Sequence, residues 1–455
     1  MIGFRESGMR RRHKFDEMLI MAEVGQFSMY KSNGVSRIIF WQLIGLCASA
    51  LFMGCANQVN EFNPDSPIAS RVKGTWRAEL QSPGGPLPFG IEFRMDGDDL
   101  LAWAINGEER AKFSSAKLDG KQLRLDFDWY DSWIVADYDL STEQFKGKWQ
   151  KTGPGGKPST LPFVAKKGAG TRFELSSDKP AVNVDGRWQV TFKDDSGEEK
   201  AEAVFHQSGS EVTGTFLTEV GDYRYLEGNV ADNELKLSTF DGAHAFLFAA
   251  TLDGDQLSGD FWSRDSYHAT WTATRIEGVE SELGNEWELA KITNASGRFR
   301  FSFPDLEGKI VSSDDERFKN RPMLINIFGS WCPNCNDKAP ILADWHREFR
   351  DQGLEVVGLA FEFTGDPKRD TEVLRRFRRR HNIEYDILLA GTNDKQLASE
   401  KLPDLSRVIA YPQTIFVGKD GVVKHVHTGF SGPGTVEKHT RLVEEMRKRI
   451  VELLE

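Results

Sequence analysis

The stretch GSWCPNCNDKAP, residues 329–340, places Cys332 and Cys335 three positions apart in a chain of 455 residues that has four cysteines. Taken alone, this motif allows three uses of the pair: a working dithiol, half of a zinc site, or an inert structural bridge. A closed zinc site needs four ligands, and His346 and His381, which follow in the sequence, do not supply a second ligand pair. We therefore predict no metal at this pair.

The residues on either side of the pair favour a working dithiol. Residues 323–330 form a near-continuous apolar stretch, as in a strand buried at the centre of a sheet, and a helical pattern follows over 333–352. A cysteine directly before a helix faces unpaired backbone N–H groups and the positive end of the helix dipole, which favour its thiolate. Cys332 is therefore the predicted nucleophile. Cys335, in the first helical turn, is predicted to resolve the mixed disulfide.

The C-terminal part of the chain, residues 297–455, alternates between strand and helix patterns. Besides the two segments around the cysteines, the pattern comprises a hairpin-like entry (297–310), an apolar strand (354–363), a helix (369–383), two strands (411–418 and 422–429) and a closing amphipathic helix (435–454). This alternation predicts an α/β domain with helices packed on both faces of a mixed sheet.

A buried strand, WCPNC opening a helix, and a later strand that starts with Tyr-Pro-Gln-Thr resemble the thioredoxin fold. Residues 297–455 are most similar to the TlpA-like thiol–disulfide oxidoreductases, which are exported and tethered to a membrane. The resemblance implies that the Tyr411–Pro412 bond is cis and faces the cysteines, leaving nearby backbone free to pair with an extended substrate. Tyr411 and Pro412, with Trp331 and Pro333 beside the reactive sulfur, are the predicted substrate-binding residues. No cofactor is expected beyond the redox-active disulfide itself.

The chain departs from this family at two positions. Many thioredoxins bury an Asp six residues before the first cysteine, and here that residue is Asn326. Many TlpA-like proteins carry a Glu three residues after the second cysteine, and here that residue is Lys338. We predict that Glu362, at the carboxyl end of the strand 354–363, takes the proton of Cys335 instead. The alternative is that Glu362 simply points outward from its strand.

The middle of the chain repeats itself at a constant offset of 112 positions. GTW (74–76) falls on GRW (186–188), and KQLRL (121–125) falls on NELKL (233–237). Such matches at one offset predict a tandem duplication. Alternating apolar residues and Asp-Gly or Ser-Gly turns predict about eight short antiparallel strands per copy.

We therefore predict two tandem all-β domains, at 71–168 and 182–276, each an antiparallel meander closing into a small barrel. A linker at 277–296 leads to the α/β domain. The GxW at the start of each copy resembles lipocalin-type barrels. The many aromatic residues have two interpretations: they form the cores, or they line a ligand pocket.

The N-terminal region has the pattern of an export signal. Lys31 and Arg37 precede an uncharged, mostly apolar run at 38–53, whose 16 residues are fewer than the roughly 20 of a membrane span. The run ends at Gly54–Cys55, which resembles a bacterial lipobox and implies a lipid on Cys55. The alternative is an uncleaved anchor helix.

We accordingly assign 1–28 to an upstream extension, 29–54 to a signal peptide and 55–70 to a polar tether. Cys47 would leave with the signal peptide and Cys55 would carry lipid, so the mature chain would keep one cysteine pair. The predicted location is the periplasm or cell envelope, with a lipid anchor in a membrane.

Composition and motifs leave two function classes and weigh against others. The net charge of −11 argues against a nucleic-acid partner. The favoured class is an enzyme that reduces or isomerises disulfides of exported proteins, with electrons from a membrane donor. The alternative is a lipoprotein whose β domains bind a partner or ligand while the C-terminal domain only docks. A thiol peroxidase would need a lone peroxidatic cysteine, which WCPNC does not provide.

Overall fold

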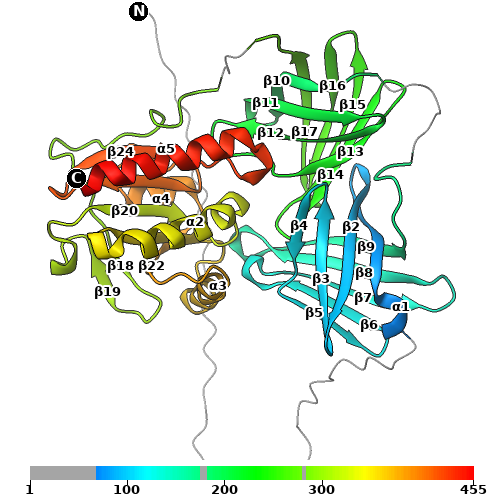
Figure 1. Ribbon diagram of the computed structural model, residues 1–455, viewed down its shortest axis with the longest axis horizontal. Helices are drawn as coiled ribbons and strands as arrows, with labels where there is room; N and C mark the ends of the chain where they lie inside the picture. Colours follow the sequence, from blue (N-terminus) through cyan, green and yellow to red (C-terminus); the bar gives the residue numbers. More distant parts are fainter. Residues whose placement is uncertain (1–67, 175–181, 279–282) are drawn as a thin grey trace, which may run out of the picture. The chain divides into compact units, whose positions relative to one another are not determined.

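The computed structural model describes residues 68–174, 182–278 and 283–455, which form two β-rich regions and a C-terminal α/β domain (Figure 1). The predicted signal peptide, lipid site and most of the tether lie outside the described residues. Among the helices that are described, none is both long enough and apolar enough to cross a bilayer.

The first β region follows a short helix, α1 (Ala69–Val72), and is one antiparallel sheet in the order β4-β3-β2-β1-β9-β8-β7-β6-β5. Its strands are β1 (Gly74–Ser82), β2 (Gly85–Asp96), β3 (Asp99–Asn106), β4 (Glu109–Lys112), β5 (Ser115–Asp119), β6 (Gln122–Phe127), β7 (Ser132–Asp139), β8 (Gln144–Thr152) and β9 (Pro158–Lys167).

This first sheet is open between β4 and β5, so the prediction that it closes into a barrel is wrong. The backbone N–H of Phe113 bonds Ala102 in β3, and that of Ser114 bonds Asp126 at the end of β6. The chain therefore passes from the β3 ladder straight into the β6 ladder. Because β4 and β5 follow each other without a reversal, they cannot pair with one another.

The second β region is a closed antiparallel barrel, in which each strand pairs with the next and β17 pairs with β10. Its strands are β10 (Gly186–Asp194), β11 (Gly197–Ser208), β12 (Glu211–Thr218), β13 (Leu226–Ala231), β14 (Glu234–Phe240), β15 (Ala245–Asp253), β16 (Gln256–Ser263) and β17 (Tyr267–Arg275).

Equivalent positions of the two β regions make the same contacts. The indole N–H of Trp76 donates to the carbonyl of Val72 at 2.7 Å, and that of Trp188 donates to the carbonyl of Val184 at 3.0 Å. Both tryptophans are fully buried. Each is therefore tied by a hydrogen bond to the residue four positions earlier.

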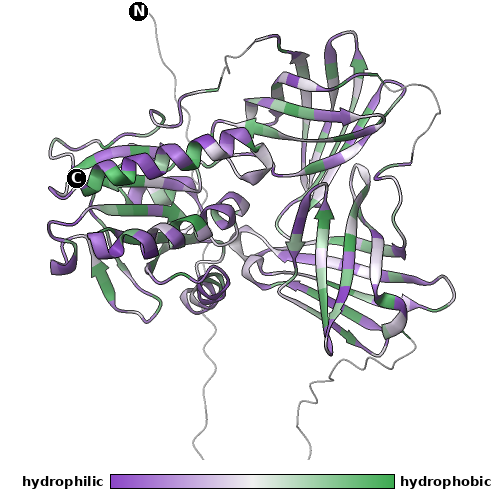
Figure 2. Cartoon of the chain, in the orientation of Figure 1, coloured by the Kyte–Doolittle hydropathy of each residue, from purple (hydrophilic) through white to green (hydrophobic). Residues whose placement is uncertain are grey.

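Aromatic side chains fill both β cores, and apolar and polar residues alternate along the strands (Figure 2). In the barrel, Phe248 stacks on Phe261 with ring centroids 4.3 Å apart. Phe240, at the end of β14, belongs to the core of the first sheet, where its ring centroid lies 4.4 Å from that of Phe89. These rings are core residues, as the first of the two interpretations expects.

The α/β domain starts with a hairpin, β18 (Ser302–Pro304) and β19 (Ile310–Ser312), and has a five-stranded sheet in the order β22-β21-β20-β23-β24. The sheet strands are β20 (Met323–Phe328), β21 (Glu355–Glu362), β22 (Asp386–Thr392), β23 (Gln413–Val417) and β24 (Val423–Thr428). The helices are α2 (Pro333–Phe349), α3 (Pro367–Arg380), α4 (Lys395–Lys401) and α5 (Glu437–Leu454).

The centre of this sheet is covered on both faces, because every residue of β20 and of β23 is buried. Strands β20, β21 and β22 are parallel, whereas β23 and β24 run antiparallel to their neighbours. The sequence patterns predicted neither β22 nor α4. Each has seven residues, which is too few to show a periodicity.

Candidate active site

Cys332 is the residue that caps the N-terminus of α2, and Pro333 is the first residue of the helix. The backbone N–H of Cys335 donates to the Cys332 sulfur at 3.3 Å, as a helix N-terminus does toward an anion. Both cysteines are free thiols, and their side chains are almost entirely buried, with 4% and 1% of their surface exposed.

The Tyr411–Pro412 peptide bond is cis, as the resemblance implied. It precedes β23 and brings the Tyr411 carbonyl to 3.2 Å from the Cys332 sulfur, which donates to it. Trp331 lies against the same tyrosine, with ring centroids 5.4 Å apart. The structure therefore brings Trp331, Tyr411 and Pro412 together around Cys332, and their role in substrate binding stays a prediction.

Trp331 is held from two sides. Its indole N–H donates to the Phe361 carbonyl at 2.8 Å, and its ring stacks on Phe363 with centroids 4.6 Å apart. Both partners belong to the carboxyl end of β21 and the residue after it. The end of this strand thus fixes the side chain that precedes Cys332 in the chain.

Glu362 lies at the same end of β21 and is buried, so the alternative of an outward-facing side chain is wrong. One carboxylate oxygen accepts from the Ser330 backbone N–H at 2.8 Å, and the other accepts from the Ser330 hydroxyl at 2.7 Å. Burial raises the pKa of Glu362 to about 7. Its described hydrogen bonds go to Ser330, and its role as the proton acceptor for Cys335 stays a prediction.

Lys338 is a second buried ionisable group, and the sequence analysis did not assign it to the site. It lies one helical turn after Cys335, has no exposed surface, and donates to the hydroxyl of Thr414 in β23. Burial lowers the pKa of Lys338 to about 7 and raises the pKa of Cys335. Its spacing from Cys335 was the only sequence signal that pointed to it.

The turn between β12 and β13 of the barrel covers the loop that holds the cysteines. Asn334, one of the two residues between the cysteines, donates its side-chain N–H to the Asp222 carboxylate at 2.9 Å. The Gly432 backbone N–H donates to the same carboxylate oxygen. Sequence reasoning missed Asp222, because nothing near it in the chain marks it as a partner of Asn334.

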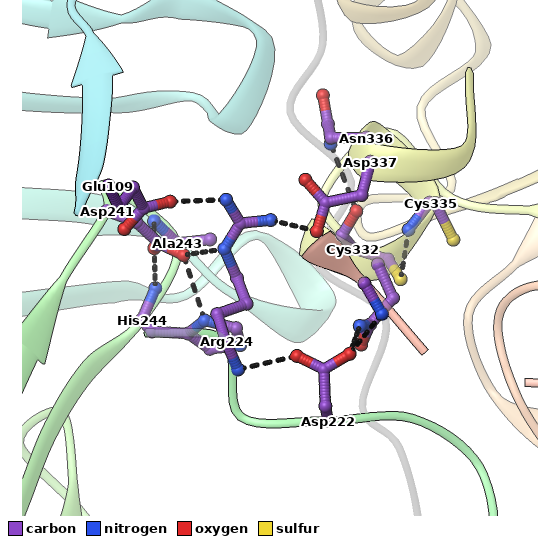
Figure 3. Close-up of polar contacts among 12 residues, drawn as sticks. Glu109, Asp222, Arg224, Asp241, Ala243, His244, Cys332, Cys335, Asn336 and Asp337 are labelled. Carbon is purple, nitrogen blue, oxygen red and sulfur yellow. Dashed lines mark hydrogen bonds and ion pairs between the residues drawn. The ribbon is translucent and has the colours of Figure 1, made fainter. Parts of the chain in front are cut away.

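Arg224, two residues further along this turn, pairs with three carboxylates from three parts of the fold (Figure 3). They are Glu109 of β4, Asp241 just after β14, and Asp337 in the first turns of α2. The Arg224 side chain is 11% exposed. The guanidinium thus joins both β regions to the helix that carries Cys335.

The first β region reaches the site from the other side. Its Gly155 backbone N–H donates to the Phe363 carbonyl at 2.9 Å, and Arg369 of α3 pairs with Asp131. Arg380 of α3 lies over the Trp129 ring at 3.3 Å from its centroid. These contacts hold the first β region against α3 and against Phe363, the residue whose ring stacks on Trp331 beside Cys332.

The arrangement suits thiol–disulfide exchange. It has a cysteine sulfur hydrogen-bonded at a helix N-terminus, a second thiol one turn later, and a carbonyl before a cis-proline beside the first sulfur. Within the described ranges, no group of three or more Cys, His, Asp or Glu side chains is placed to hold a metal ion.

A family model described as the AhpC/TSA family matches residues 298–426. The C-terminal domain is a thioredoxin-superfamily domain. It is similar to the thiol–disulfide oxidoreductase ResA of Bacillus subtilis, with 24% identity over 153 residues that cover 34% of this chain and 77% of ResA. It is also similar to peroxiredoxin Q of Oryza sativa subsp. japonica, with 26% identity over 179 residues that cover 39% of this chain and 77% of the peroxiredoxin.

Among solved structures, the chain is similar to a thiol:disulfide interchange protein DsbE of Chlorobium tepidum. The two are 17% identical, with a TM-score of 0.27, and the match covers 34% of this chain and 94% of the other. The family model and the match to ResA support a C-terminal domain of the thiol–disulfide oxidoreductase kind. These matches cover two-fifths of the chain or less, so they leave the function of the β regions open.

Proposed function

We propose that this protein is an exported thiol–disulfide oxidoreductase that reduces, or isomerises, disulfides of other exported proteins through Cys332 and Cys335. The observation that carries the proposal is the Cys332 sulfur, which accepts the Cys335 N–H at a helix N-terminus and lies 3.2 Å from the Tyr411 carbonyl. That geometry places the sulfur at the positive end of the helix dipole and beside the backbone that an extended substrate would meet.

In the proposed reaction, the Cys332 thiolate attacks one sulfur of a substrate disulfide, and the other substrate sulfur leaves as a thiolate. Cys335 then attacks the Cys332 sulfur, which releases the second substrate thiolate and leaves a Cys332–Cys335 disulfide. Two electrons have passed from the dithiol to the substrate. A membrane-bound dithiol donor would then reduce the Cys332–Cys335 disulfide again, so no cofactor other than the redox-active disulfide is required.

We also propose that the chain is directed to the periplasm or cell envelope by residues 29–54 and held at a membrane by lipid on Cys55. The support is the sequence pattern, because an apolar run followed by Gly-Cys has the form of a lipoprotein signal. On the same reading, the two β regions arose by duplication of one domain and hold the catalytic domain at a distance from the membrane.

The second candidate function is that of a binding lipoprotein, in which the β regions act and the C-terminal domain only docks. The contacts of Asp222 and Arg224 with α2 favour it to this extent, since they cover the surface that a substrate of Cys332 would need. A docking domain, however, has no need of two cysteines at a helix N-terminus, and for this reason we favour the enzyme.

The reduction potential of the Cys332–Cys335 pair tests the proposal. The full-length protein is equilibrated in thiol redox buffers, alkylated, and analysed peptide by peptide, with Cys335→Ser as the variant that cannot form the bond. A value near thioredoxin's, about −270 mV, is expected for a reductase, and a value near about −120 mV would show an oxidant. If the pair never cycles, the enzyme is ruled out and the binding function takes its place.

A further inference from the structure

A lysine is rarely buried without a partner of opposite charge. The Lys338 side chain has no exposed surface, and among the described residues no carboxylate lies within ion-pair distance of its Nζ atom. Its hydrogen bond goes to the neutral hydroxyl of Thr414, and its Nζ atom lies 5.6 Å from the centroid of the Phe430 ring. An uncompensated amine in such a place calls for a functional reason.

The group that Lys338 serves is identified by its position on α2. Residues three apart on a helix lie on the same face, which puts Lys338 next to Cys335. The two groups interact electrostatically, each favouring the charged form of the other. We propose that Lys338 controls the protonation of Cys335 and receives its proton, as a general base, when Cys335 attacks the mixed disulfide. The inference rests on the proposed function.

A lone thiolate in this buried place is costly, and burial therefore raises the pKa of Cys335. Transfer of its proton to a neutral amine converts an uncharged pair into a thiolate and an ammonium ion, whose attraction offsets part of the cost. Burial lowers the pKa of Lys338 to about 7, so a large fraction of the amine is neutral, and able to accept a proton, at neutral pH.

Other titratable groups around the pair come from several elements. His427 of β24 interacts with Lys338 but is bonded to Glu286, while Tyr385 and Tyr411 interact with Cys335. Burial raises the pKa of both tyrosines, and burial with Lys338 nearby lowers the pKa of His427. Glu362, the acceptor predicted from the sequence, also has a pKa of about 7, but both of its carboxylate oxygens accept hydrogen bonds from Ser330. Lys338 is the neighbour that lies one helical turn from Cys335, interacts with it, and has a pKa near neutral pH.

The step balances in atoms and electrons. The Cys335 proton moves to Lys338, the Cys335–Cys332 bond forms, and the bond between Cys332 and the substrate sulfur breaks. The substrate leaves as a thiolate, which takes up one proton, and the substrate disulfide has gained the two electrons that the cysteine pair has lost. The only co-reactant is the disulfide of the protein substrate.

The test follows the resolving step without a protein substrate. Full-length protein is treated with an excess of dithiobis(nitrobenzoate) at about pH 4, where the reagent slowly traps Cys332 as a mixed disulfide with thionitrobenzoate while Cys335, whose pKa burial raises, stays protonated and does not expel it. A jump to a higher pH lets Cys335 expel the coloured thiolate. Cys332→Ser corrects for labelling of Cys47 and Cys55, and Cys335→Ser shows the background release.

In the parent chain we expect the release rate to rise through about pH 7. Lys338→Met, which keeps the length and removes the amine, should lower the rate at pH 7 by about 100-fold, the lower end for a lost general base, and move the midpoint upward. Lys338→Arg, whose charge does not titrate in this range, should abolish the inflection near pH 7 in the plot of release rate against pH. It replaces the Met variant as the test if that variant does not fold.

Two outcomes overturn different statements. If the parent chain releases thionitrobenzoate and both Lys338 variants keep its pH profile within about twofold, the role of Lys338 is refuted and the proposed function stands. If the parent chain with both cysteines releases no more than Cys335→Ser does, the dithiol does not work and the proposed function fails with it.

Discussion

Arg224→Met should open the face of the catalytic domain that carries Cys332. The guanidinium pairs with Glu109, Asp241 and Asp337, and these carboxylates are as deeply buried as the arginine itself. Without the arginine, three carboxylates remain close together with no guanidinium between them, although Asp241 keeps its bond to His244. Separation of the β regions from α2 would relieve that repulsion by returning the carboxylates to water.

The size of the effect follows from the burial. Removal of one partner from a buried ion pair costs about 3–5 kcal/mol, and every 1.4 kcal/mol is about tenfold in an equilibrium constant. Protonation of Asp337, whose pKa burial already raises, offsets part of this cost. We therefore expect the population with an accessible Cys332 to rise about 100-fold, the lower end of the range.

The assay is the rate at which iodoacetamide modifies Cys332 in the full-length protein, measured by mass spectrometry of its peptide. Labelling of a buried thiol through local opening follows the population of the open form. The matched control is Arg71→Met, which removes an arginine from the exposed pair with Glu143 and should change the rate by less than about twofold. A denaturant titration of each variant shows whether the domains stay folded.

The proposed role of Arg224 is refuted if Arg224→Met leaves the labelling rate of Cys332 within about twofold of the parent rate while the protein stays folded. In that case the contacts of Arg224 do not hold the β regions on the catalytic domain. If Arg224→Met does raise the labelling rate, the same variant can be used to ask whether an uncovered dithiol reduces a protein disulfide faster.

Three further outcomes follow from the contacts. Burial raises the pKa of Glu362 from 4.5 to about 7. The folded protein is therefore most stable, as far as this group is concerned, below about pH 4.5, and it loses that stability as the pH rises through 7. Glu362→Gln should remove up to about 3 kcal/mol of this pH dependence in denaturant titrations. Phe240→Ala should cost about 3–5 kcal/mol and speed amide exchange across residues 74–167, although Phe240 belongs to the barrel. Asn334→Ala, which removes the bond to Asp222, should raise the alkylation rate of Cys332 by about fivefold, as expected for a net hydrogen bond of about 1 kcal/mol.

The sequence by itself determined the reactive centre, because each of its signals is local. Two cysteines three positions apart, an apolar strand before them and a helical pattern after them place Cys332 at a helix start, and it caps α2. The strand that starts at Tyr411–Pro412 and the strand that follows it were predicted from short apolar runs. Period-two alternation and Asp-Gly turns likewise predicted the antiparallel strands of both β regions, without showing that β4 and β5 follow each other and leave one sheet open.

Only the tertiary structure decided what surrounds that centre. Arg224 and Asp337 are 113 positions apart, and nothing in the turn that carries Asp222 and Arg224 distinguishes it from a solvated polar loop. Lys338 and Glu362 are buried although their residue types are usually exposed. Apolar periodicity indicates which face of an element is buried. The identity of a charged residue does not show whether its side chain is in water or contacts a partner inside the protein. Which polar groups contact each other depends on how the helices and strands pack together, and local sequence patterns do not indicate that packing.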